Sequence, residues 1–510
     1  MAKGVGQIMP FGDYAPDLAK IRPGGLMEAA NVWRSRIAYH PIPSPVYTDT
    51  FPTRVRNAVL TQAVKYGGTD DAYQFFVGTD GYIFEVTKDG IVDRSRHWME
   101  LGHYEAGRWE FAQYGDDLIA VNPRESLLRV RLEDRLPIRQ GKLGRYIPAD
   151  KTLRPIIPPR AAHIGVVREF VVVGRTFDYT DGWRRQRVRW SAADDPLNWK
   201  PEADTLSDFQ DLLGDGGDIT GIVGGEYGLV FQENAVYRMT YAGQPLAFQF
   251  DKIESARGAA APGSIVDIGN APDGGRAVFF LAHDGFFRQD GQASHPIGQN
   301  VVDRTILSKY NKERADEVCG GHDPTRQSIW WTIPIGLDGF DTWCYHYNLG
   351  LWTHVPSVKG RWFGLAFRPV HTLNEEKGRL NAALGSFDDP VNQKQFCEFA
   401  VIDVDNRLGF FNGPPLPATF ITSEAVQTNN YAGWINSIRP IADAKTWAMS
   451  LGYRLNLDVE PTWTPPRAPD YDGEAKFHAS PRYLQVRLDI DGFWEEAQGL
   501  IYTMERRGRR

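Results

Sequence analysis

The stretch Asp218–Glu254, DITGIVGGEYGLVFQENAVYRMTYAGQPLAFQFDKIE, decides the fold. It holds four apolar runs of strand length: Ile219–Val223, Leu229–Gln232, Ala235–Tyr241 and Leu246–Ile253. Turn-forming residues separate them: Gly224-Gly225, Glu233-Asn234 and the segment 242–245. In the last run Leu246, Phe248 and Phe250 recur with a period of two, which places them on one face of a strand. The stretch therefore predicts a four-stranded meander with one buried face.

The same hairpin pattern recurs in the segments Gln74–Asp93 and Val278–Gly291. Each has an apolar run, an Asp-Gly turn (Asp80-Gly81 or Asp284-Gly285) and a second apolar run. Asp-Gly between apolar runs indicates a hairpin, because glycine adopts the positive φ that a tight turn needs. One four-stranded sheet cannot bury its apolar face alone and must stack on other elements. Recurrent four-stranded units favour a mainly β fold containing a β-propeller.

We expect seven sheet units between Ala58 and about Pro414. They lie near Gln74–Asp93, Phe111–Arg131, Ala161–Trp190, Ile219–Ile253, Ala277–Ile297, Ile329–His354 and Phe363–Ile402. Their spacing of roughly 40–60 residues is irregular and is at or above the repeat length of regular propellers. The expected number of blades is therefore about six to eight.

The sixth unit is rich in aromatic residues: Trp330, Trp331, Trp343, Tyr345, Tyr347 and Trp352. Aromatic residues that alternate along strands normally pack against their neighbours, so we interpret them as blade core. A platform on which carbohydrates stack is the functional alternative.

The chain divides into three expected parts: an N-terminal arm (1–57) that is part of a platform, a β-propeller (58–414) and a C-terminal β-rich platform domain (415–510). The arm is expected to be extended because it is rich in proline, with a short helix only at Leu26–Arg34. In the C-terminal part, apolar and polar residues alternate over Arg482–Asp491, which predicts a half-buried strand. Further strands are expected at Trp447–Leu457 and Gly499–Met504, a proline-rich loop at Thr462–Asp472 and a basic tail at Glu505–Arg510.

The net charge of −7 and pI near 5.9 argue against tight, charge-driven binding of DNA. They are compatible with a pore that holds a passing polyanion weakly. The three cysteines lack CxxC spacing and indicate neither a disulfide framework nor a zinc site. The N-terminus lacks the pattern of a signal peptide, and no run approaches the roughly 20 apolar residues that cross a bilayer. We expect a soluble, unsecreted protein without membrane insertion.

The candidate contact residues are Arg185, Arg187 and Arg189, in the basic and aromatic stretch Trp183–Trp199. On a strand they share one face and could contact DNA phosphates or a neighbouring subunit. The alternative is an exposed blade face on which these arginines pair with carboxylates such as Asp194 and Asp195.

No catalytic constellation is expected. The acidic pairs Asp70-Asp71, Asp194-Asp195, Asp388-Asp389 and Glu495-Glu496 could in principle serve a glycosidase. Adjacent residues on a strand point to opposite faces, however, so none is a ready-made catalytic pair. Segments 403–405 and 489–492 do not complete a calcium loop, and the chain has no HExxH, GxSxG or Walker A motif. We predict no catalytic residues, no metal site, no cofactor and no enzymatic activity.

The run Gly217–Gly258, with ITGIVGGEYGLVFQENAVYRMTYAG and FQFDKIESARG, resembles the tail nozzle proteins of short-tailed bacteriophages, also called packaged-DNA stabilisation proteins. The upstream RVRWSAADDPLNW shares this resemblance. The N-terminal PGGLMEAANVWRSRIAYHPIPSPV and the C-terminal SPRYLQVRLDI with a final GRR are similar to the family's two ends. The resemblance would cover nearly all of the chain.

The resemblance implies a virion structural protein, built from a β-propeller and a platform that joins subunits, that forms a ring of six copies. The ring would extend and close the DNA channel below the adaptor, retain packaged DNA and take part in its ejection. Its partners would be the adaptor protein, tail fibres or spikes, and the genomic DNA that passes through. The protein would reside in the virion tail, and in the host cytoplasm during assembly.

No single residue carries over from the family as a gate. Within this hypothesis we expect a neutral or acidic lumen with basic residues confined to small rings. Two alternatives from other classes remain: a glycan-binding or glycan-cleaving β-propeller protein, and a cellular propeller scaffold for protein partners.

Overall fold

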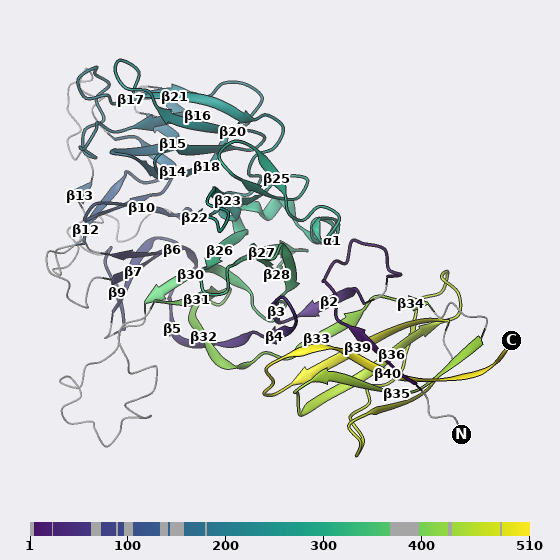
Figure 1. Cartoon of the computed structure of the whole chain (residues 1–510). Coiled ribbons are helices and arrows are strands. Elements are labelled where there is room, and N and C mark those ends of the chain that lie inside the picture. The colour runs from purple at the N-terminus through teal and green to yellow at the C-terminus, as the bar shows by residue number, and fades with distance from the viewer. Residues whose placement is uncertain are drawn as a thin grey trace, which may run out of the picture.

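Strands make up most of the structure, which is a computed structural model. It describes residues 5–22, 24–62, 73–87, 90–95, 106–132, 141–142, 158–178, 181–367, 397–426, 431–479 and 482–509. Among them the helices are α1 (Asp303–Lys309) and the 3-10 helices η2 (Pro262–Ser264) and η3 (Lys312–Glu317). The expectation of a mainly β protein is confirmed, and Figure 1 shows many small sheets in one part of the molecule and longer strands in the other.

Seven four-stranded antiparallel units occupy most of residues 43–415. Units one to three are β6 (Val55–Gln62), β7 (Tyr73–Thr79), β8 (Tyr82–Thr87) and β9 (Gly90–Asp93); β10 (Glu110–Tyr114), β11 (Asp117–Val121), β12 (Leu128–Arg131) and β13 (Gly141–Lys142); and β14 (Arg160–Val167), β15 (Phe170–Asp178), β16 (Gly182–Trp190) and β17 (Asp208–Asp211).

Units four and five are β18 (Ile219–Val223), β19 (Gly228–Gln232), β20 (Val236–Tyr241) and β21 (Phe248–Glu254), and β22 (Val266–Asn270), β23 (Arg276–Leu281), β24 (Phe286–Gln289) and β25 (Ser294–Pro296). Units six and seven are β26 (Cys319–Asp323), β27 (Ser328–Ile335), β28 (Gly339–His346) and β29 (Leu351–His354), and β30 (Gly360–Phe367), β31 (Cys397–Asp403), β32 (Arg407–Pro415) and β5 (Pro43–Thr50). Each expected sheet unit thus corresponds to one of these seven.

Unit four matches the meander expected from the sequence, with one difference. Phe248 is buried and Phe250 is partly buried, but Leu246 lies before β21 and is 69% exposed. Leu246 belongs to the connection between β20 and β21. The apolar alternation in the sequence therefore begins before the strand does, and its first residue is not part of the buried face.

Neighbouring units pack through their first strands. β6 packs against β10, β10 against β14, β14 against β18, β22 against β26, β26 against β30, and β30 against β6. Between units four and five, the Arg276 guanidinium donates hydrogen bonds to the carbonyl oxygens of Tyr227 (2.6 Å) and Gly224. Some approaches leave no room for a side chain: a Cβ at Gly165 would lie 2.9 Å from the Ile222 Cγ2 atom. Because β30 of unit seven packs against β6 of unit one, the first and last units are neighbours.

The seventh unit combines the two ends of this region. β5, from the N-terminal arm, pairs antiparallel with β32, with Val46 opposite Phe410. The arm thus crosses from the platform and supplies the outer strand of the last sheet, while β6 begins the first sheet a few residues later.

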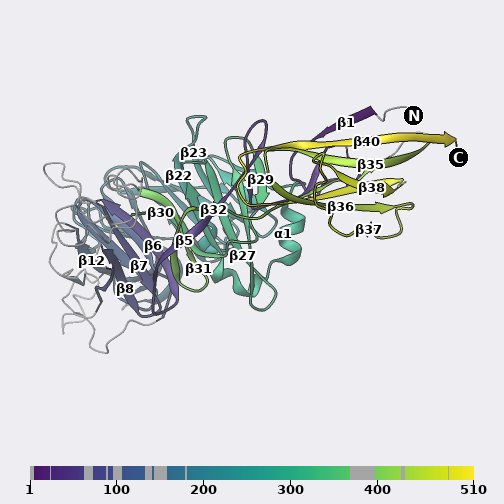
Figure 2. The same ribbon diagram turned by 90° about the horizontal axis from the view of Figure 1, so that it is seen from below.

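The platform is formed by one separate sheet and by the far part of the ten-stranded sheet that begins with unit six (Figure 2). One has the order β3 (Val32–Arg34), β4 (Tyr39–Pro41), β40 (Ala497–Arg509), β35 (Tyr431–Ala442) and β38 (Ala475–Ala479), with β1 (Val5–Pro10) also paired to β40. The other has the order β2 (Leu26–Ala30), β33 (Ala418–Thr422), β39 (Tyr483–Asp491), β36 (Thr446–Arg454) and β37 (Thr462–Trp463), with β34 (Ala425–Val426) paired to β39. A single parallel pair, Ala30 with His354, joins the second sheet to unit six.

Some expectations for the two ends were wrong. Leu26–Arg34 is not a helix but the strands β2 and β3, separated by Asn31 at φ 60°. The arm is not merely extended, because it supplies strands β1 to β5. Residues 505–509 of the expected basic tail continue β40 and pair with β35. The strand expected over Arg482–Asp491 is confirmed as β39, where Leu484, Val486, Leu488 and Ile490 are buried.

One hydrophobic cluster spans both regions. It joins Phe279, Trp331 and Trp352 of units five and six to Ile435, Phe420 and Leu488 of the platform. The four tryptophans of unit six are at most 1% exposed, and Tyr345 is buried as well, which confirms their interpretation as core. Tyr347 is partly buried at the margin of the cluster. The shared core shows that the platform is packed on units five and six.

Candidate functional site

The three candidate arginines lie on β16 in very different surroundings. The Arg185 side chain is 66% exposed, and its guanidinium is 3.5 Å from the Asp218 carboxylate. The Arg187 and Arg189 side chains are only 5% and 3% exposed. Arg185 is therefore the member of the set that a phosphate or a neighbouring subunit could reach.

Arg187 and Arg189 are held by carboxylates of their own unit. Arg187 donates hydrogen bonds to Asp211 (2.6 Å) and Asp181 (2.7 Å). Arg189 donates to the Asp178 carboxylate (2.6 Å) and the Trp199 carbonyl oxygen (2.8 Å). Pairing with carboxylates was the alternative expectation, but the suggested partners were wrong.

Asp194 and Asp195 lie instead in an exposed turn, where Asp195 accepts a hydrogen bond from the Leu197 amide. Arg184 and Arg175 add exposed or partly exposed positive charge next to Arg185. Neither Arg184 nor Arg175 was among the contact residues predicted from the sequence. Alternation along β16 could not identify Arg184, and Arg175 comes from the neighbouring strand β15.

The other acidic pairs form no joint site among the described residues. Glu495 and Glu496 donate their backbone amides to the Asp443 carboxylate. Asp403 accepts the backbone amides of Asp405 and Arg407 within its own turn. The pairs Asp70-Asp71 and Asp388-Asp389 lie outside the described residues.

A central cavity of about 430 Å³ lies where the seven units meet. Residues on or next to the first strand of every unit line it; they include Asn57, Glu110, Ile164, Gly221, Asp267, Gly320 and Trp362. Arg108 and Arg361 also line it, as does Cys319. Burial raises the pKa of the Cys319 thiol to about 12, although the nearby Arg108 and Arg361 charges oppose the shift. That thiol therefore stays protonated at neutral pH.

Among the described residues, both carboxylates that line the cavity, those of Glu110 and Asp267, already contact other residues. The Glu110 carboxylate contacts His163 Nδ1 at 2.9 Å and accepts a hydrogen bond from the Ile164 amide. The Arg108 guanidinium approaches Glu110 only to 3.9 Å. Asp267 lies 3.5 Å from the Arg276 guanidinium.

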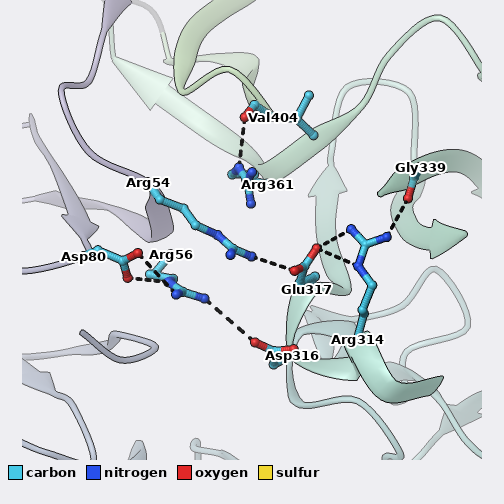
Figure 3. Close-up of polar contacts among 9 residues, drawn as sticks. All are labelled: Arg54, Arg56, Asp80, Arg314, Asp316, Glu317, Gly339, Arg361 and Val404. Carbon is cyan, nitrogen blue, oxygen red and sulfur yellow. Dashed lines mark hydrogen bonds and ion pairs between the residues drawn. The ribbon is translucent and has the colours of Figure 1, made fainter. Parts of the chain in front are cut away.

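An ionic network flanks the cavity and connects the start of unit one to η3 (Figure 3). Arg56 contacts Asp80 at 2.6 Å and Asp316 at 3.8 Å. Glu317 lies between two guanidiniums, 3.1 Å from Arg54 and 2.5 Å from Arg314. Although Glu317 is partly buried, these two arginines hold the pKa of its carboxyl below the usual value.

Arg361 of β30 lies beside this network but differs from the other arginines in its partners. Its Nε donates to the Val404 carbonyl oxygen at 3.1 Å, and in the described part of the chain no carboxylate lies within 4.0 Å of its guanidinium. Figure 3 shows it beside Arg54. Burial lowers the pKa of Arg361, and the positive charges of Arg54 and Arg56 lower it further, although the negative charges of Glu317 and Asp80 oppose the shift.

A second buried cluster lies where unit six meets the platform. His354 contacts the Glu28 carboxylate through Nδ1 and the Asp341 carboxylate through Nε2, both at 2.7 Å. Burial alone would lower the pKa of His354, but the hydrogen bonds to Asp341 and Glu28 outweigh it and raise the value to about 9. A charged imidazole therefore bridges β2 of the platform and β28 of unit six.

Within the described ranges, no group of three or more His, Cys, Asp or Glu side chains is arranged to hold a metal ion. The helices described there are also too short or too polar to cross a bilayer.

No family model matches the chain. No curated protein matches it either. Among solved structures, a chain of a mitotic checkpoint complex is similar with TM-score 0.37 and 10% identity, over 72% of this chain and 97% of that chain. The extracellular domain of a putative hybrid two-component system from B. thetaiotaomicron is similar with TM-score 0.39 and 9% identity, over 87% of this chain and 48% of that chain. At these TM-scores neither similarity bears on function.

Proposed function

We propose that this protein is a non-enzymatic virion component that forms the tail nozzle of a short-tailed phage. The observation that carries the proposal is the resemblance of Gly217–Gly258 to that family, a segment that contains all of unit four. Six copies would form a ring below the adaptor, extend and close the DNA channel, retain packaged DNA and contact fibres or spikes.

The proposal includes a closed β-propeller of seven blades. Three observations support closure: the seven consecutive four-stranded units, the packing of β30 against β6, and the addition of β5 to the last sheet. Such a disc joined to a platform through a shared core suits a wall, because a head-to-tail ring transmits force only through subunits that keep their shape.

The exposed arginines of unit three are compatible with weak binding of a passing polyanion. Arg187 and Arg189 are neutralised within their own unit, which leaves Arg185 and its neighbours as the exposed cationic group. The glycan-binding alternative gains no support from the aromatic residues of unit six, because the four tryptophans and Tyr345 are buried and not free to stack on a sugar, and Tyr347 is partly buried.

Electron microscopy of the purified protein, alone and with the adaptor protein of the same genome, tests the proposal. We expect six-fold rings with an axial channel that dock on the adaptor, and a lumen that is neutral or acidic. A protein that stays monomeric in the presence of the adaptor would contradict it. A ring with a continuous lining of lysine and arginine would contradict the lumen prediction alone.

A further inference from the structure

The central cavity contains two arginines whose charge the protein leaves largely uncompensated. Arg361 has only the Val404 carbonyl oxygen as a hydrogen-bond acceptor among the described residues. Arg108 approaches Glu110 no closer than 3.9 Å, and its buried Nε has no hydrogen-bond partner in the same set. Both residues line the cavity, and the charges of both lower the pKa of the Cys319 thiol, so both guanidiniums lie near this part of the cavity.

The nearby carboxylates compensate this pair only in part. Glu110 is committed to His163 and the Ile164 amide, and Asp267 lies beside Arg276. The carboxylates of the flanking network are used as well: Asp80 and Asp316 contact Arg56, while Glu317 contacts Arg54 and Arg314. Arg361 therefore lies in the field of the Arg54 and Arg56 guanidiniums as well as of the Glu317 and Asp80 carboxylates, but in the described part of the chain no carboxylate lies within 4.0 Å of its guanidinium.

A partly buried guanidinium without a counter-ion is costly, because desolvation and repulsion by like charges both disfavour it. An anion in the cavity would offset both. The planar fork of N–H donors on arginine matches the oxygens of phosphate, and two such forks favour a tetrahedral oxyanion over chloride. The volume of about 430 Å³ accommodates a phosphate group with its waters.

We propose that the central cavity is a binding site for a phosphate group, with Arg108 and Arg361 as its cationic residues. This site is separate from the exposed arginines of β16 and does not depend on the proposed role in a phage tail. The phosphate group could belong to free inorganic phosphate or to the end of a nucleic acid strand, since both present the same oxygens.

Calorimetric titration of the full chain with inorganic phosphate, at constant ionic strength set with sodium chloride, tests the site. We expect saturable binding and a rise in Tm with phosphate. R108Q and R361Q should each weaken binding about tenfold or more, because each removes charge-assisted hydrogen bonds. R361K keeps the charge but loses the fork, and we expect an intermediate affinity.

The matched control is R257Q, in which an arginine that is 43% exposed and pairs with Asp284 outside the cavity is neutralised. It should bind phosphate like the unmodified protein. Circular dichroism and Tm without phosphate identify a variant that fails to fold. If R361Q does so, R108Q decides the question, since Arg108 donates no hydrogen bond to the described residues that its loss would break.

A second titration uses a 5′-phosphorylated oligonucleotide and the same oligonucleotide without its phosphate. Binding of inorganic phosphate together with a preference for the phosphorylated strand would assign the end of a nucleic acid as ligand. Binding of inorganic phosphate alone would assign the free ion. The absence of saturable phosphate binding, or equal affinities of R108Q, R361Q and the unmodified protein, would overturn the proposal.

Discussion

The region of seven units and the platform are both made of antiparallel strands, but they are assembled in opposite ways. In units one to six, each strand pairs with the next strand along the chain. In the platform, β1 and β4 pair with β40, and β2 pairs with β33, so strands from the two ends of the chain lie side by side. The first region is a series of local hairpins, whereas the second exists only when distant segments have met.

Because of this difference, the two regions lose different amounts of loop-closure entropy when they fold. A local meander gains its hydrogen bonds at a small cost in loop-closure entropy, whereas long-range pairing requires closure of a much longer loop. The platform must recover that cost through packing. Its cluster of buried residues is shared with units five and six, and it also buries the ion pair of Arg454 with Glu424.

The largest effect is expected from W352A. Trp352 contacts Trp331, Phe286 and Tyr345 in the shared cluster, and its indole N–H donates to the Ile297 carbonyl oxygen at 2.9 Å. We expect a loss of about 3–5 kcal/mol in the free energy of unfolding, measured by urea denaturation. W463A, which removes a side chain 40% exposed at the edge of the platform, is the matched control and should cost far less. Loss of stability in unit four alone would contradict a shared core.

R454M should be the next most severe change and should act on the platform. Arg454 and Glu424 form an ion pair of 2.6 Å, with side chains 7% and 2% exposed. Removal of the arginine leaves a buried carboxylate unpaired, which costs about 3 kcal/mol. Hydrogen exchange measured by mass spectrometry should quicken in β36 and β39 and stay unchanged in β19. The double variant R454M/E424Q should recover part of the loss, and no recovery would show that packing, not charge, is responsible.

The junction between the regions should respond to pH. The pKa of His354 is raised from 6.5 to about 9, so its contribution is fully present below pH 6.5 and is lost as pH rises through 9. The linked change in unfolding free energy is on the order of 2–3 kcal/mol. H354Q should be less stable at pH 6.5 and should show a shallower decline between pH 6.5 and 9. Parallel pH profiles of the two proteins would exclude His354 as the source.

The smallest effect is expected from R185A. Arg185 is mostly exposed and its ion pair with Asp218 is 3.5 Å long, so its loss should change the unfolding free energy by less than about 0.5 kcal/mol. R187A, two residues along β16, leaves Asp181 and Asp211 without their partner and should cost clearly more. Equal costs, measured by urea denaturation, would mean that burial does not separate these two arginines.

The sequence predicted the local region well for a physical reason. Asp80-Gly81 connects β7 directly to β8, with Gly81 at φ 89°, and the apolar runs of unit four are close to its strands. Such signals lie within a few residues of the structure they determine. The helix predicted for Leu26–Arg34 was wrong because the strands of this segment pair with β33, β4 and β29, which include segments hundreds of residues away. The apolar spacing of the segment itself fits a helix as well as a strand.

The candidate sites show the same limit. Alternation along β16 placed Arg185, Arg187 and Arg189 together, but it could not show that the carboxylates of Asp178, Asp181 and Asp211 engage two of them. Arg108 and Arg361 line the same cavity only because the first strands of different units surround it. No spacing rule connects two residues that a seven-unit arrangement brings together.

The outer strand of the seventh unit has a consequence for synthesis. β5 emerges from the ribosome before any of the other units, yet its partner β32 is made only after all of them. Until then, residues 43–50 carry an unsatisfied strand edge that a chaperone, or another nascent copy, could bind. Pairing of this segment with β32 therefore requires nearly the whole chain, so a product truncated before β32 would leave the β5 edge open.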